Sequence, residues 1–79
     1  MADGRSLHTI AAEIRRFWPK MNPAAKPYVD AMVTLRSVDE NYYLDSGSSI
    51  VRYFLANAGT WRGPDARRIK EELKRLLGE

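Results

Sequence analysis

Hydrophobic residues recur at every third or fourth position along most of the chain, which is the spacing of one face of an α-helix. The first such stretch covers residues 6–18, where charged side chains fall on the opposite side. Ser6 suits the N-cap position, and Pro19 ends the pattern because proline lacks the amide donor that a helix requires. We predict a helix over residues 6–18, whose apolar positions are Leu7, Ile10, Ala11, Ile14, Phe17 and Trp18.

A second helix is predicted over residues 24–37, with a wide apolar face formed by Tyr28, Val29, Met32, Val33 and Leu35. Asn22 and Pro23 look like an N-cap and a first-position proline, but Pro27 offers a second start, so the helix begins at about residue 24 or 27. A strand over residues 32–38 is the alternative. We disfavour it because the alternation is poor and no second strand is predicted to pair with it.

The third apolar stretch predicts a helix over residues 46–58, with Ile50, Val51, Phe54, Leu55 and Ala58 on one side. Residues 39–45 before it are acidic and aromatic, and form either a loop or an early turn of this helix. The glycine–serine run at 46–49 supplies several caps. A phosphate-binding loop is the other interpretation, but no strand precedes the run and the P-loop lysine is missing. Gly59 stands where a helix often stops in a left-handed conformation.

The fourth helix is predicted over residues 64–77. Pro64 suits the first helical position, and Asp65 places negative charge at the positive end of the helix dipole. Lys74 and Arg75 place positive charge at the other end. We expect the last two helices to pack against each other, joined by the turn that contains Trp61.

These elements predict an all-α fold, a compact bundle of four short helices at about 6–18, 24–37, 46–58 and 64–77. The 79 residues leave room for one core, so residues 1–79 form a single domain, with residues 1–5 frayed. The predicted core consists of Leu7, Ile10, Ile14, Phe17, Val29, Met32, Val33, Ile50, Val51, Phe54, Leu55, Ile69, Leu73 and Leu76.

The net charge of +3 is unevenly distributed. Residues 1–46 hold six Lys/Arg and six Asp/Glu, whereas residues 47–79 hold seven Lys/Arg and four Asp/Glu, so the whole excess lies on the last two helices. A negatively charged partner would be steered there. The plainer interpretation is that a modest basic surplus aids solubility.

The small inventory of reactive side chains argues against catalysis. There is no cysteine and one histidine, His8, which excludes disulfides, Cys/His pairs and multi-histidine metal sites. Nothing suggests a pocket around the carboxylates Asp39 and Asp45. As a calcium loop, this segment fails at the third ligand position, where Tyr43 stands, and no glycine follows. We predict that the protein is not an enzyme and holds no metal or cofactor.

The cellular location is inferred by default. No apolar run approaches the roughly 18 residues of a membrane span. The first residues lack the apolar stretch of a signal peptide. We therefore expect a cytoplasmic location and no membrane partner.

The many large aromatic rings favour a small helical protein–protein interaction module, because tyrosine, tryptophan and arginine anchor interfaces. The partner is another protein or a second copy of the chain, as a homodimer. The candidate partner-binding residues are Trp61, Arg62, Arg67, Arg68, Tyr42 and Tyr43. For Trp61 the competing interpretation is that its ring folds back over the last two helices and closes the core.

The alternative function is DNA or RNA binding through the last helix and the preceding turn. A helix-turn-helix alignment is not clean in either register, whether Gly59 or Gly63 is taken as the turn glycine. Arg67 with Glu71, and Arg68 with Glu72, are also spaced to neutralise each other, whereas a phosphate-binding helix usually shows unopposed cations. Nucleic acid is therefore the less favoured partner.

Overall fold

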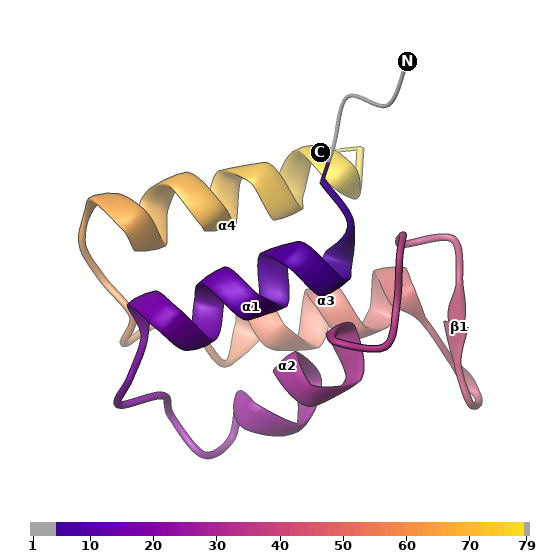
Figure 1. Cartoon of the computed structure of the whole chain (residues 1–79), viewed down its shortest axis with the longest axis horizontal. Coiled ribbons are helices and arrows are strands. Elements are labelled where there is room, and N and C mark those ends of the chain that lie inside the picture. Colours follow the sequence, from indigo (N-terminus) through magenta and orange to yellow (C-terminus); the bar gives the residue numbers. More distant parts are fainter. Residues whose placement is uncertain (1–4, 79) are drawn as a thin grey trace.

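The computed structural model describes residues 5–78, which form four helices and one two-stranded hairpin (Figure 1). The elements are α1 (Leu7–Phe17), α2 (Lys26–Met32), β1 (Asn41–Tyr42), β2 (Asp45–Ser46), α3 (Gly47–Ala56) and α4 (Pro64–Leu76). The predicted helical bundle is confirmed, and α1, α3 and α4 begin within one residue of their predicted starts. Residues 1–5 were predicted to be frayed; of these, residues 1–4 lie outside the described residues.

Helix α1 begins with two independent sets of hydrogen bonds. The side chain of Ser6 accepts from the amide of Thr9, as expected of an N-cap. The next two amides, of Leu7 and His8, donate to the carbonyls of Arg36 and Leu35, at 3.1 and 2.8 Å. The segment that follows α2 therefore satisfies amides that no intrahelical carbonyl can reach.

Helix α2 is shorter than predicted. It begins at Lys26, with Pro27 in its first turn, and ends at Met32 rather than at Ser37. The chain leaves the helical path after Thr34, whose hydroxyl donates to the carbonyl of Ala31. Beyond that point the backbone carbonyls turn toward the start of α1, so tertiary pairing overrides the helical propensity of this segment. The alternative strand over 32–38 is not formed either.

The acidic and aromatic segment before α3 forms the hairpin, which the sequence did not predict. Asn41 pairs with Ser46 and Tyr42 with Asp45, so the loop is two residues long. Its first residue, Tyr43, has a φ of 56°, a conformation uncommon outside glycine. Ser46 then caps α3 by accepting from the amide of Ser49.

The prediction that Gly59 stops α3 in a left-handed conformation is wrong. Helix α3 ends at Ala56, and the Asn57 side chain donates to the carbonyl of Tyr53, closing the last turn. The positive φ lies instead at Gly63, at 111°, directly before α4. A residue without a Cβ is therefore needed where the chain enters α4, and not where it leaves α3.

The expected pairing of the last two helices is also corrected. Helix α4 packs mainly against α1, whereas α3 packs against α2, so α1 lies between the last helix and the rest of the bundle (Figure 1). Trp61, in the turn between α3 and α4, stacks on Trp18 at the end of α1, and Phe54 of α3 meets both indole rings edge-on. This aromatic cluster joins the two helix pairs.

Most of the predicted core is confirmed, with Leu7, Ile10, Ile14, Val29, Met32, Ile50, Val51, Phe54, Ile69 and Leu73 buried. The prediction that Phe17 belongs to the core is wrong, since this residue is 36% exposed. Val33, Leu55 and Leu76 are partly buried and pack against the core from its edge. Trp18 is buried instead. Helix α1 ends at Phe17, so the backbone of Trp18 is no longer helical and its side chain points in a different direction from the helical one.

Candidate functional site

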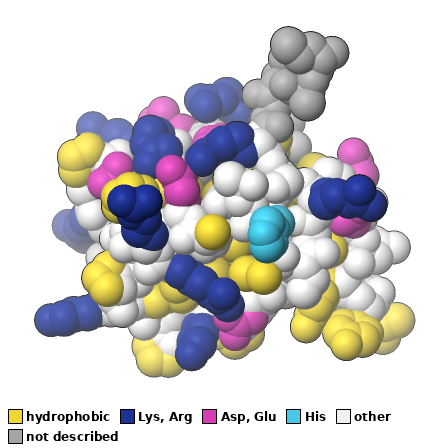
Figure 2. All heavy atoms as spheres, in the orientation of Figure 1, with side chains coloured by type: hydrophobic (Ala, Val, Ile, Leu, Met, Phe, Trp, Pro, Cys, Tyr) yellow, Lys and Arg dark blue, Asp and Glu magenta, His cyan; other side chains and the backbone are white. Residues whose placement is uncertain are grey.

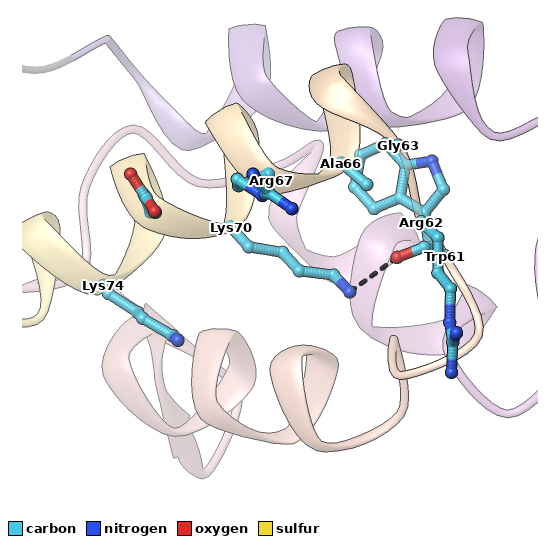
Figure 3. A pocket seen from close by; sticks show the side chains of 8 residues that line it. Trp61, Arg62, Gly63, Ala66, Arg67, Lys70 and Lys74 are labelled. Carbon is cyan, nitrogen blue, oxygen red and sulfur yellow. Dashed lines mark hydrogen bonds between the residues drawn. The ribbon is translucent and has the colours of Figure 1, made fainter.

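A pocket of about 310 Å³ lies between the Trp61–Gly63 turn and the face of α4 that runs from Ala66 to Lys74 (Figure 3). It is lined by Trp61, Arg62, Gly63, Ala66, Arg67, Lys70, Glu71 and Lys74. Four of these eight side chains are cationic and one is anionic. We call this surface the basic pocket.

Helical spacing brings the cations together. Arg67, Lys70 and Lys74 are separated by three and four residues, so they lie on one face of α4. Figure 3 shows Lys70 and Lys74 extending from the same side of the helix. Arg62 joins them from the turn, because the positive φ of Gly63 redirects the chain immediately before Pro64. Two different backbone elements thus supply charge to one pocket.

Lys70 is the structural centre of the basic pocket. Its ammonium group donates to the backbone carbonyl of Trp61 at 2.7 Å, which ties α4 to the turn. Burial lowers the pKa of Lys70, and the positive charges of Lys74 and Arg62 lower it further. The smaller effect of Lys74 and Arg62 on this pKa reflects the positive charge gathered around Lys70, which an anion would offset.

The neighbouring face of α4 has a different electrostatic environment. Glu72 accepts two hydrogen bonds from Arg5, at 2.6 and 3.0 Å. Arg68 pairs with Glu13 of α1 and with Asp65, both at 3.3 Å. The predicted helical pair between Arg68 and Glu72 is therefore not the arrangement that forms.

The charge network on this face centres on Arg5, which was expected to be frayed. Arg5 also contacts Glu13, at 2.7 Å, and so links the chain before α1 to α1 and α4. Hydrogen bonds from Arg5 hold the pKa of both Glu13 and Glu72 below the ordinary value of a glutamate. The acids of this face are thus already neutralised by Arg5 and Arg68.

Cations in the basic pocket lack such partners. Within residues 5–78, Arg62, Arg67 and Lys74 form no ion pair with another side chain. Of the acids of α4, Asp65 pairs with Arg68 and Glu72 with Arg5, so only Glu71 lies among the pocket cations. The basic pocket therefore gathers cations that no acid of the described residues pairs with.

The six residues predicted to contact a partner do not form one surface. Arg62 and Arg67 line the basic pocket, and Trp61 borders it although the residue is only 4% exposed. Arg68 lies on the neighbouring, paired face. Tyr42 and Tyr43 lie in the hairpin, stacked edge-on with ring centroids 4.7 Å apart. Of the two interpretations of Trp61, the buried ring is the one that the structure shows.

Two pocket residues were missed from the sequence, Lys70 and Lys74. Their spacing from Arg67 was visible, but the pairing of neighbouring charges on α4 drew attention to Arg68 and its acids. The distinguishing signal is that Arg67, Lys70 and Lys74 share a face that carries a single glutamate.

A second exposed surface lies at the hairpin. Tyr43 is 85% exposed and Leu44 is fully exposed, although both are large and hydrophobic. Figure 2 shows hydrophobic side chains gathered at this end of the molecule. Large apolar side chains held in solvent are informative, because they contribute nothing to the core.

The chain matches no protein-family model, no curated protein and no solved structure. None of the helices in the described part is long and apolar enough to cross a lipid bilayer. Residues 5–78 also contain no group of three or more histidine, aspartate or glutamate side chains placed to hold a metal ion.

Proposed function

We propose that this protein is a small, non-catalytic interaction module that binds an acidic segment of a partner protein in the basic pocket. The observation that carries the proposal is the convergence of Arg62, Arg67 and Lys74, without ion-pair partners in residues 5–78, around Lys70 and a concave surface. Carboxylates suit this arrangement, because guanidinium groups bind them through two parallel hydrogen bonds. Long-range attraction by the same charges would raise the association rate.

The size of the pocket favours an acidic peptide over a nucleic-acid duplex. From Arg67 to Lys74 the charged face of α4 extends only about 10 Å, at 1.5 Å per residue. Duplex binders typically contact six to ten phosphates, which needs a longer basic surface. Single-strand binders add exposed aromatic rings on which bases stack, but the ring of Trp61 is buried against Trp18.

Nucleic-acid binding is the second candidate, and one observation favours it. The unopposed cations lie on the last helix and on the turn before it, which is where this alternative requires them. Its signature would be a steep loss of affinity with increasing salt, because each neutralised phosphate releases counterions.

Fluorescence anisotropy distinguishes these functions. A labelled peptide of alternating glutamate and tyrosine, and a DNA duplex, are titrated with the full chain at about 50 mM salt, where charge pairing is weakly screened. The pocket variant combines Arg67→Glu with Lys74→Glu. The control variant combines Arg16→Glu with Lys20→Glu, which changes the net charge equally and replaces exposed residues outside the pocket.

The peptide is expected to bind, and the pocket variant to bind at least about tenfold more weakly, whereas the control variant changes affinity by less than about threefold. Absence of peptide binding, or equal weakening by both variants, would refute the proposal. Preferential binding of the duplex, weakened in the pocket variant, would establish the second candidate instead.

A further inference from the structure

The hairpin has the opposite charge to the basic pocket. Residues 39–45 contain three acids and no base. Glu40 forms an ion pair with Arg36, but Asp39 and Asp45 form no ion pair with another residue of the 5–78 range. Between these acids stand the exposed side chains of Tyr43 and Leu44. The hairpin thus presents an acidic segment with an apolar tip, which is the chemistry that the basic pocket is proposed to bind.

Backbone pairing constrains the tip. The β1–β2 pairing fixes both ends of the two-residue loop, and the amide of Gly47 donates to the carbonyl of Glu40 at 2.6 Å. Tyr42 is half-buried against the core and supports the ring of Tyr43 edge-on. A segment that is already ordered loses little conformational entropy when it docks. Tyr43 also has a positive φ, which glycine or asparagine would adopt with less strain, and such strained residues cluster at functional positions.

The tip is not seated in the basic pocket of its own molecule, because Tyr43 and Leu44 are exposed and no hairpin residue lines that pocket. In Figure 1 the hairpin projects beyond the helices at the right, whereas the turn that joins α3 to α4 lies at the left. The molecule measures 28 × 27 × 20 Å along its principal axes. In this arrangement the tip and the pocket of one molecule are both left open to a second copy.

We propose that the acidic hairpin tip of one molecule docks in the basic pocket of a second copy. This inference rests on the proposed function of the pocket. Asp39 and Asp45 face the unpaired cations, and the side chains of Tyr43 and Leu44 pack on Ala66 and the aliphatic stems of the lysines. Because the two surfaces differ, each molecule keeps a free tip and a free pocket, and association continues head to tail into short open chains.

The contact is small, so it is reversible. A two-residue apolar tip flanked by two or three carboxylates falls at the low end of protein interfaces, which bury less than about 1,200 Å² and are transient. Each copy carries a net charge of +3, so two copies repel each other at low salt in most orientations. The orientation that brings the acidic tip to the basic pocket is therefore the favoured one.

Sedimentation velocity of the full chain at concentrations up to about 1 mM tests the proposal, because weak contacts of this size are populated only in that range. The tip variant combines Tyr43→Asn, which suits the positive φ, with Leu44→Lys, which repels the pocket. The pocket variant is again Arg67→Glu with Lys74→Glu. Circular dichroism confirms that both variants keep the helical content of the parent.

The wild-type chain is expected to exceed the mass of a dimer as its concentration rises, whereas each variant alone stays monomeric. An equimolar mixture of the two variants should form a heterodimer and nothing larger, because only one intact tip and one intact pocket remain per pair. The proposal would be overturned if the wild-type chain stayed monomeric or stopped at a dimer. It would also be overturned if both variants associated as strongly as the wild-type chain. If the acidic peptide still binds the pocket in that case, the proposed function survives without the self-association.

Discussion

Trp18 and Trp61 stack in an offset, nearly parallel arrangement, with ring centroids 5.2 Å apart and planes 6° from parallel. One ring comes from the C-cap of α1 and the other from the turn between α3 and α4, and both are buried. The turn that carries the basic pocket is therefore attached to the core by its aromatic ring, while its carbonyl accepts from Lys70 on the outer side. The position of the pocket depends on this contact.

Removal of the second ring should strongly destabilise the fold. Trp61→Ala is expected to lower the free energy of unfolding by about 3–5 kcal/mol, because it removes a buried aromatic side chain and leaves a cavity beside Trp18 and Phe54. Trp61→Phe keeps an aromatic ring and should lower it by less than half as much. Urea denaturation followed by circular dichroism measures both changes. A loss below about 1 kcal/mol in Trp61→Ala would show that the ring contributes little to the core.

Two glycines should respond in opposite ways to the same substitution. A Cβ at Gly47 would lie 2.8 Å from the carbonyl oxygen of Ser37 and 2.9 Å from the Cα of Val38, so the backbone before the hairpin must move. Gly47→Ala is expected to destabilise by about 1–3 kcal/mol, the usual range for overpacking. At Gly59 nothing lies within 4 Å of an added Cβ, and φ is not positive.

Gly59→Ala serves as the matched control. It should leave stability unchanged or raise it by up to about 1 kcal/mol, because alanine restricts the unfolded chain. Thermal unfolding of the two variants under the same conditions compares them directly. Equal destabilisation by both would contradict the close approach of Gly47 to the Ser37–Val38 backbone.

The Arg5 network should make stability depend on pH at the acidic end. Hydrogen bonds from Arg5 lower the pKa of Glu72 and of Glu13 below 4.5 in the folded chain, so the unfolded chain binds protons more readily. The stabilisation is complete above that value and is lost as pH falls through the lowered folded pKa values. Arg5→Ala is expected to lower the free energy of unfolding at neutral pH by about 0.5–1 kcal/mol, since the groups are partly exposed.

The loss of unfolding free energy caused by Arg5→Ala should shrink toward zero between about pH 5 and pH 2, as the carboxyls of Glu13 and Glu72 become protonated. Arg36→Ala is the matched control, because its side chain is 86% exposed and pairs only within its own segment. Urea unfolding at a series of pH values measures both. If the loss of stability in Arg5→Ala stayed constant down to pH 2, Arg5 would act through packing rather than through its ion pairs.

Helical periodicity predicted three of the four helices almost to the residue, because their caps and prolines act locally. The errors lie where partners distant in the sequence decide. Helix α2 ends early since the carbonyls of Leu35 and Arg36 accept from the start of α1. The hairpin at 41–46 is too short to show alternation, and its loop has tyrosine rather than glycine at the positive φ.

The basic pocket was predicted only in part for a similar reason. Arg62 and Arg67 were identified, but Lys70 and Lys74 were not, because the sequence cannot show which acids of α4 are bound elsewhere. Arg5 binds Glu72 and Glu13 from outside the helix. That long-range pairing is what leaves the cations of the opposite face unopposed.

Chemical-shift mapping on the isotopically labelled full chain tests the basic pocket most directly. Titration with the acidic peptide at about 50 mM salt should shift amide signals of residues 61–74, with the largest changes at Arg62, Arg67 and Lys70, and about 500 mM salt should reverse them. Shifts that cluster elsewhere, or no shifts at low salt, would contradict the claim that this protein binds acidic partners through α4 and the turn before it.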